Sequence, residues 1–182
     1  MSRHTLGICL AIAASCAFAQ GHADSPAGQA AYDPSEIQYI DVSAATKAIA
    51  EPYFDAYIRR DWDAVEPLLG ADSEWFDPTA AQIFGGVARS GRGEIMAFFR
   101  KSYAGITDMR ANVMRRTFSS NYAIFEATLD WSVKVGKDKV VTTAAMPFLV
   151  ILKVVEGKVV EHRDYGDYRN FIEEFRRVRA PG

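Results

Sequence analysis

Hydrophobic side chains repeat at helical spacing in the first half of the chain. Three segments between residues 41 and 105 carry apolar residues three or four positions apart, which gathers these residues on one side of a helix. The first helix is expected to begin near Asp41 and to kink at Pro52, because proline lacks the backbone N–H of a helix interior. Asp61 and Ser90 are the expected N-caps of the second and third helices.

After Gly105 the spacing changes from helical to alternating, which is typical of half-buried strands. A short strand is also expected before the third helix, and a short helix after the last strand. The short strand is predicted at residues 74–77, the long strands at 109–118, 122–135, 140–155 and 158–165, and the closing helix near 168–176. Helices followed by an antiparallel meander indicate an α+β fold, with three N-terminal helices packed in a strongly curved antiparallel sheet.

The N-terminal segment has the features of a signal peptide. A positive start is followed by an apolar run, and Ala17-Phe18-Ala19 matches a small-x-small cleavage site. The run is shorter than the roughly 20 residues that cross a bilayer, and both cysteines lie within it. We therefore divide the chain into a signal peptide (1–19), a flexible linker (20–40) and a single domain (41–182) of a periplasmic or secreted protein.

Charge and motifs exclude several classes of function. The formal net charge is -2 and acids and bases are mixed throughout, so nothing favours a nucleic acid or a membrane surface as partner. No HExxH motif, cysteine cluster or carboxylate spacing indicates a metal. Gly85-Gly86 and Gly91-x-Gly93 are too short for nucleotide-binding loops. We expect chemistry without a cofactor or metal.

Three acids occur where they could converge in one pocket. Asp164 shares a face of the last strand with His162, because side chains alternate along a strand. Asp77 ends the first short strand, and Asp130 lies on the polar face of the second long strand. Buried carboxylates serve as general acids and bases because burial shifts their proton affinity. We predict Asp164 as the principal base, with Asp130 or Asp77 as its helper or rival; salt-bridge, turn and solvent-facing roles are the structural alternatives.

Two tyrosines and a set of mostly apolar residues complete the predicted site. Tyr53 and Tyr57 lie on the apolar stripe of the first helix, where a buried hydroxyl needs a partner that a pocket acid could supply. Aromatic residues that face a cavity favour a small hydrophobic, aromatic ligand. The residues expected to contact this ligand are Trp75, Phe98, Phe99, Thr128, Met146 and Phe148.

Over about residues 43–175, the order of elements resembles the SnoaL-like branch of the nuclear transport factor two superfamily. The stretch from Tyr53 to Asp77-Pro78 is similar to the start of bacterial ketosteroid isomerase. The resemblance implies a cone-shaped α+β barrel, with Asp77 as a proton shuttle and Tyr53 as an oxyanion donor. The isomerase's second oxyanion donor, an aspartate, falls on Leu149.

Two further stretches resemble other members of this superfamily. Asp61-Trp62-Asp63, with the tyrosine four residues before it, is similar to scytalone dehydratase, which eliminates water. The stretch from Glu156 to Asp167 looks like the end of limonene epoxide hydrolase. This likeness implies that Asp164 and Asp130 form that enzyme's aspartate pair, with Thr128 in the place of its bridging arginine.

Together these features predict an exported, cofactor-independent enzyme that uses aspartate, tyrosine and histidine as acids and bases. A lyase, acting by dehydration or retro-aldol-type cleavage, is favoured because the isomerase's aspartate and the hydrolase's arginine are both replaced. The alternatives are an epoxide hydrolase, a double-bond isomerase and a non-catalytic binder of a lipophilic ligand. The resemblance also implies a homodimer, which the apolar face of residues 122–135 would support.

Export can be tested on the protein itself. Intact-mass analysis of the periplasmic protein should give a chain that begins at Gln20, because cleavage is expected after Ala19. A cytoplasmic protein that retains Met1 would show that the segment is not a signal peptide.

Overall fold

The computed structural model describes residues 34–85 and 88–179, so the predicted signal peptide and residues 20–33 of the predicted linker lie outside the described residues. The elements are α1 (Pro34–Arg59), α2 (Trp62–Val65), η1 (Glu66–Leu68), β1 (Leu69–Phe76), α3 (Ala81–Phe84), β2 (Ala88–Ser90), α4 (Arg92–Ser102), η2 (Tyr103–Gly105), β3 (Ile106–Ser119), β4 (Tyr122–Lys134), β5 (Val140–Val155), β6 (Lys158–Gly166) and α5 (Arg169–Arg179).

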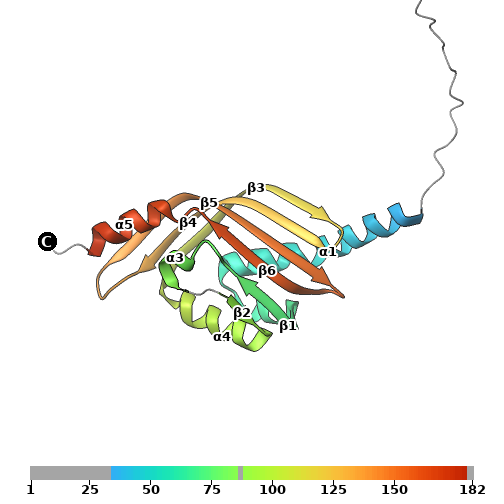
Figure 1. The fold of residues 1–182 in the computed structure, drawn as a ribbon, viewed down its shortest axis with the longest axis horizontal. Coiled ribbons are helices and arrows are strands. Elements are labelled where there is room, and N and C mark those ends of the chain that lie inside the picture. Colours follow the sequence, from blue (N-terminus) through green and yellow to red (C-terminus); the bar gives the residue numbers. More distant parts are fainter. Residues whose placement is uncertain (1–33, 86–87, 180–182) are drawn as a thin grey trace, which may run out of the picture. The chain divides into compact units, whose positions relative to one another are not determined.

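The strands form one curled sheet in the order β2-β1-β6-β5-β4-β3 (Figure 1). The antiparallel meander from β3 to β6 confirms the α+β prediction. The prediction of a wholly antiparallel sheet is wrong in one pair, because β1 runs parallel to β6. β2, which was not predicted, pairs antiparallel with β1 at the edge of the sheet. This edge places Trp75 of β1 directly beside His162 of β6.

The helices begin and end differently from the prediction at several points. α1 starts at Pro34, so residues 34–40, assigned to the linker from the sequence, are helical. Pro52 lies inside this helix without interrupting it, on an exposed position. Asp61 is the N-cap of α2, as predicted, and accepts a hydrogen bond from the Ala64 N–H. α4 is capped by Gly91, one residue after the predicted Ser90.

α1 lies against the concave face of the sheet and supplies much of the core. Tyr53, Phe54 and Tyr57 are each at most 2 % exposed, and the Phe54 ring stacks on Phe125 of β4 at a centroid distance of 4.1 Å. Phe125, Leu129 and the other inward residues of β4 are apolar, whereas Asp130 is exposed on the opposite face. The apolar face of β4 therefore packs inside the domain and gives no support to a dimer interface.

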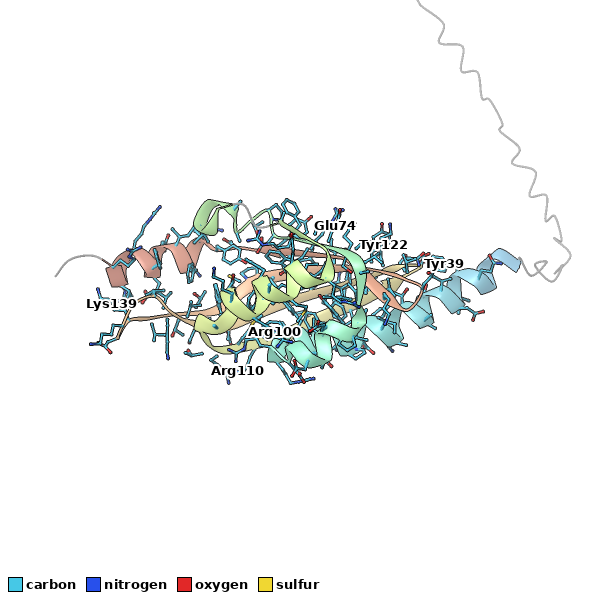
Figure 2. All side chains as sticks on the ribbon, turned by 90° about the horizontal axis from the view of Figure 1, so that it is seen from below. Tyr39, Glu74, Arg100, Arg110, Tyr122 and Lys139 are labelled. Atoms are coloured by element: carbon cyan, nitrogen blue, oxygen red, sulfur yellow. The ribbon has the colours of Figure 1, made fainter. Side chains whose placement is uncertain are left out.

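Charged side chains cover the outside of the domain. Figure 2 shows Arg100, Arg110 and Lys139 projecting away from the ribbon, and all three are exposed. Within residues 34–85 and 88–179, no helix combines the length and the apolar character that crossing a membrane requires.

Truncating the Phe125 ring should destabilise the fold strongly. Phe125→Ala is expected to lower the free energy of unfolding by about 3–5 kcal/mol, because the ring is fully buried and its loss leaves a cavity beside Phe54. Glu126→Ala on the outer face is the control. It should change the free energy of unfolding by less than about 1 kcal/mol, because the ion pair of Glu126 with Arg115 is exposed. Chemical denaturation measures both, and equal losses would contradict this account of the core.

Candidate active site

His162 and Asp164 point inward from β6 and are each 1 % exposed. Their alternation on the strand places both side chains on one face, as the sequence predicted. Val160 was expected on the same face, but the register with β5 shifts at this point and Val159 is buried in its place. The irregularity precedes His162 and Asp164 and leaves their shared face intact.

Three donors surround the Asp164 carboxylate. Oδ2 accepts hydrogen bonds from the Tyr57 hydroxyl at 2.7 Å and from Trp75 Nε1 at 3.2 Å, and Oδ1 lies 2.8 Å from His162 Nε2. A buried carboxylate is costly unless hydrogen bonds replace its lost water. The donors come from α1, β1 and β6, so the fold is arranged around this group.

His162 connects Asp164 to a second tyrosine. The Tyr53 hydroxyl lies 2.9 Å from His162 Nδ1. With Nε2 donating to Asp164, the neutral ring accepts at Nδ1, and Tyr53 donates to it; this tautomer is assigned from the partners. Both ring nitrogens are therefore satisfied, and Tyr53 is held deep in the core at 0 % exposure.

A chain of hydroxyls leads from Asp164 toward the surface. The Tyr57 and Tyr103 oxygens are 2.5 Å apart, and because Tyr57 donates to Asp164, Tyr103 is the donor to Tyr57. Burial, and then the Asp164 charge, raise the pKa of both tyrosines well above the ordinary value. Both phenols therefore remain protonated and can act as hydrogen-bond donors.

Asp77 is a second buried carboxylate, at the end of β1. Its Oδ1 accepts from the backbone N–H groups of Thr79 and Ala80 and from the Thr79 hydroxyl, and its Oδ2 accepts from the Tyr168 hydroxyl at 2.6 Å. Burial raises the pKa of Asp77 above its ordinary value, although the hydrogen bonds from Thr79 and Tyr168 act in the opposite direction. The charge of Asp164 raises it slightly further.

The main cavity, of about 400 Å³, opens beside Asp77. It is lined by Trp75, Asp77, Ala80, Arg89, Phe98, Ser102, Tyr103, Ile106, Trp131, Val133 and Tyr168. A smaller inner space of about 30 Å³ reaches Tyr57 and Asp164, and it shares Tyr103, Trp131 and Tyr168 with the main cavity. A volume of several hundred Å³ suits one small organic ligand, so Asp77 would meet a ligand directly and Asp164 through the tyrosines.

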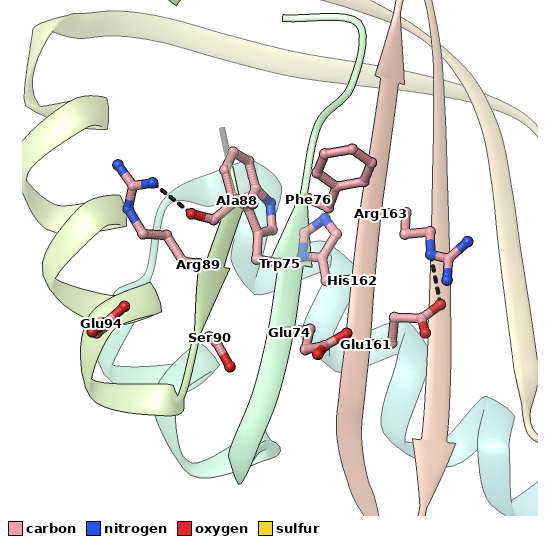
Figure 3. Close-up of a pocket in the computed structure, with 10 residues that line it drawn as sticks. All are labelled: Glu74, Trp75, Phe76, Ala88, Arg89, Ser90, Glu94, Glu161, His162 and Arg163. Carbon is pink, nitrogen blue, oxygen red and sulfur yellow. Dashed lines mark hydrogen bonds and ion pairs between the residues drawn. The ribbon is translucent and has the colours of Figure 1, made fainter. Parts of the chain in front are cut away.

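A larger hollow of about 560 Å³ lies at the edge formed by β2, β1 and β6 (Figure 3); it shares Trp75 and Arg89 with the main cavity and is also lined by His162. Glu74, Glu94, Glu161 and Arg163 line it, and Figure 3 shows the Arg163–Glu161 ion pair on its wall. Neither Asp77 nor Asp164 lines this hollow. Because it lacks the buried acids, we take the 400 Å³ cavity as the candidate site.

Asp130 does not join the other acids, so the predicted convergence of Asp130 with Asp164 is wrong. Asp130 is exposed on the outer face, where its Oδ1 accepts a hydrogen bond from the Ala145 N–H at 2.7 Å. Ala145 has a positive φ of 50° at a break in the β4–β5 register, which identifies Asp130 as a cap for a β-bulge. Thr128 lies on the same outer face of β4 and lines neither cavity.

The other predicted residues are divided between the cavities and the core. Trp75 and Phe98 line the main cavity, while Met146 and Phe148 line the inner space. Phe99 is fully buried and lines neither of them. The catalytic and ligand-binding roles of these residues stay predictions.

Sequence reasoning did not identify Tyr103, Tyr168 or Thr79 as parts of the site. Tyr103 was assigned only to the apolar stripe of its helix, which hid the role of its hydroxyl. Tyr168 directly follows Asp167, in the polar stretch that drew attention to Asp164. Thr79 lies two residues after Asp77, a spacing that favours side-chain to backbone turns.

Removing the Tyr168 hydroxyl should raise the pKa of Asp77. Tyr168→Phe deletes a hydrogen bond that favours the ionised carboxylate and keeps the aromatic ring. Carbon-13 NMR titration of the Asp77 carboxyl measures the change. Tyr165→Phe, near the end of β6, is the control and should leave the titration unchanged; a lowered Asp77 pKa in Tyr168→Phe would contradict this assignment.

Solved structures of other proteins share this fold. A protein of Shewanella putrefaciens CN-32, provisionally assigned as a SnoaL-like polyketide cyclase, matches with a TM-score of 0.62 and 20 % identity over 71 % of this chain and 95 % of its own. An LEH-like epoxide hydrolase from M. tuberculosis matches with a TM-score of 0.56 and 16 % identity over 74 % of this chain and 92 % of its own. TerC, co-crystallised with polyporic acid, matches with a TM-score of 0.58 and 17 % identity over 71 % of this chain and 96 % of its own.

The sequence comparisons agree with the structural ones. Among curated protein sequences, none matches this chain significantly. The family model described as a SnoaL-like domain matches residues 50–162, which is more than half of the chain and runs from α1 to His162 in β6. With the curled sheet over α1 and the cavity beside Asp77, this match shows that the chain belongs to the SnoaL-like domain family.

Proposed function

We propose that this protein is a cofactor-independent lyase that acts on a small hydrophobic, aromatic molecule by acid–base chemistry. One observation carries the proposal: two buried carboxylates serve a single aromatic cavity, Asp77 directly and Asp164 through Tyr57 and Tyr103. Members of the family are often cofactor-independent enzymes, and TerC was crystallised with polyporic acid, which supports a small organic ligand.

Asp77 is proposed as the base. Its Oδ2 has one hydrogen-bond partner, Tyr168, and it lines the cavity in which the substrate would lie. A carboxylate whose pKa is raised by burial is a stronger base than an exposed one, and it is still ionised when the pH is above that pKa. The sequence had favoured Asp164, but Asp164 is met by three donors and lines only the inner space.

Tyr103 is proposed as the hydrogen-bond donor to the departing oxygen, with its O–H turning from Tyr57 toward the substrate. In a dehydration, the C–H bond breaks and its proton passes to Asp77, while the C–O bond breaks and the leaving oxygen accepts a hydrogen bond from Tyr103. The proton on Asp77 then passes to the leaving hydroxide. Before the substrate binds, the hydrogen bonds from Tyr103 to Tyr57 (2.5 Å) and from Tyr57 to Asp164 (2.7 Å) position the Tyr103 hydroxyl. The products are an alkene and water, and Asp77 is ionised again.

A retro-aldol-type cleavage would use the same groups. Asp77 would take the proton of the substrate hydroxyl, the C–C bond would break, and Tyr103 would donate to the oxygen of the resulting enolate. Both reactions need an apolar site that keeps water away from the reacting groups, and Trp75, Phe98 and Trp131 on the cavity wall supply it.

Double-bond isomerisation is the second candidate, and epoxide hydrolysis is less favoured. Asp77 faces the cavity and precedes Pro78, as the resemblance to ketosteroid isomerase implied. For hydrolysis by the limonene epoxide hydrolase arrangement, Asp130 would have to lie beside Asp164, but Asp130 is exposed on the outer face. Tyr53 is fully buried and lines neither the main cavity nor the inner space, whereas Tyr103 lines both, so Tyr103 is the better placed oxyanion donor.

Location and assembly are further proposals. Export rests on the N-terminal sequence pattern. A homodimer now rests on the resemblance alone, because the apolar face of β4 is occupied by the core. Light scattering of the purified mature chain tests the dimer.

Substitution of the two acids tests the function. Three classes of substrate are screened. Aromatic β-hydroxy ketones report a lyase by loss of water or release of an aldehyde. Aromatic epoxides report a hydrolase by formation of a diol, and β,γ-unsaturated aromatic ketones report an isomerase by a shifted double bond. Asp77→Asn should lower kcat by at least about 100-fold, the lower range for general acid–base help. Asp164→Asn should also lower it, because Asp164 positions Tyr103 through Tyr57. Asp130→Asn is the matched control and should keep near-full turnover, since its amide oxygen can still cap Ala145.

The pH dependence of kcat/KM gives an independent test of Asp77 as the base. Because Asp77 acts ionised, kcat/KM should rise as the pH rises through the pKa of Asp77, and burial places this limb above the ordinary carboxyl value. Full activity in Asp77→Asn would contradict its role as base. If no substrate turns over but an aromatic ligand co-purifies, and neither acid substitution changes its binding, the protein is a binder.

A further inference from the structure

Arg89 is the cationic residue on the wall of the main cavity. It belongs to β2, the short edge strand, and pairs in register with Trp75 of β1. Figure 3 shows its side chain beside Trp75, and its guanidinium carbon lies 4.4 Å from the centre of the Phe98 ring. Trp75 and Phe98 both line the cavity, so the charge is held at an aromatic wall of the candidate site.

No carboxylate of the described residues forms an ion pair with Arg89. The hydrogen bond that its guanidinium makes is from Nη1 to the carbonyl oxygen of Ala88, whereas a guanidinium carries five N–H donors. Arginines nearby are neutralised: Arg163 pairs with Glu161 at 2.7 Å and Arg100 with Asp63 at 2.8 Å. Arg89 thus keeps both its charge and free donors at the cavity.

The stacking on Phe98 also fixes the plane of the guanidinium. An arginine stacked on a ring leaves its edge N–H groups free, and these match the two oxygens of a carboxylate. Because Arg89 is only partly buried, it has lost part of its water without gaining an anionic partner. A ligand carboxylate would supply that partner.

We propose that Arg89 binds a carboxylate of the substrate, so that the cavity selects an aromatic carboxylic acid. The inference deepens the proposed function, on which its catalytic meaning rests. With the acid group on Arg89, the aromatic body would contact Trp75 and Phe98, and the reacting carbon would lie toward Asp77 and Tyr103. The anion must bind at the Arg89 side, since the negative charge of Asp77 would repel it elsewhere in the cavity.

Binding of a matched ligand pair tests the proposal without any turnover. The probes are 2-naphthoate and 2-naphthylmethanol, which share an aromatic body and differ in charge. Calorimetry on the full-length mature protein should show 2-naphthoate bound about 10- to 100-fold more tightly, the range of a charge-assisted hydrogen-bonded pair. Arg89→Gln should abolish this preference while binding of the alcohol changes little. Arg89→Lys keeps the positive charge but loses the paired N–H donors of the guanidinium, and should retain part of the preference for 2-naphthoate.

Arg163→Gln removes an exposed arginine outside the main cavity and is the control that should keep the full preference. The proposal is overturned if the wild-type protein binds the two probes equally or binds neither, or if Arg89→Gln keeps the preference. Asp77→Asn separates the two proposals, because it should lose turnover and still prefer the carboxylate. A preference that depends on Arg89 in a protein without turnover would leave this inference standing and refute the proposed lyase.

Discussion

The burial of the Asp164 carboxylate is the constraint on which the rest of the site depends. A negative group at 1 % exposure needs hydrogen-bond donors, and here they come from three separate elements: Tyr57 of α1, Trp75 of β1 and His162 of β6. The parallel pairing of β1 with β6 brings Trp75 beside His162, and the packing of α1 against the sheet brings Tyr57 against the His162 ring. The same contacts that satisfy the charge therefore also hold the fold together at this point.

The two carboxylates differ in what surrounds them, and this difference suggests a division of work. Asp77 lies on the cavity and has a pKa raised by burial, whereas Asp164 lies behind Tyr103 and Tyr57. Pairs of acids in unlike environments commonly take unlike roles in proton transfer. Asp77 at the ligand would move the proton, and Asp164 at the end of the hydroxyl chain would position the tyrosine that donates to the departing oxygen.

Local patterns predicted much of the fold, and long-range pairing explains what they missed. β5 has the predicted bounds because alternating residues run without a break between two turns. The alternation of β6 placed His162 and Asp164 on a shared face, although a shift in register replaced Val160 by Val159. The parallel contact of β1 with β6 joins segments far apart in the chain, and no local signal reports it.

The errors at the site have a common physical origin. We expected the polar face of β4 to line a pocket, but in this domain the apolar face packs on α1 and the polar face meets water, so Asp130 and Thr128 lie outside. Tyr103 was missed because an aromatic residue on an apolar stripe gives no sign of where its hydroxyl ends, and Tyr168 because its place in a polar stretch does not reveal that its hydroxyl reaches Asp77. The hydroxyl positions depend on how η2 and the turn before α5 close over the sheet, which is a property of the whole fold.

A double-mutant cycle tests most directly whether Asp164 acts through the tyrosine chain. Turnover is measured for Tyr103→Phe, Asp164→Asn and the double variant on one confirmed substrate. If the two residues act through one chain of hydrogen bonds, the double variant should lose about as much activity as the more damaging single variant, because the chain is already broken. Losses that multiply would show independent roles and contradict the connection from the buried carboxylate to the cavity.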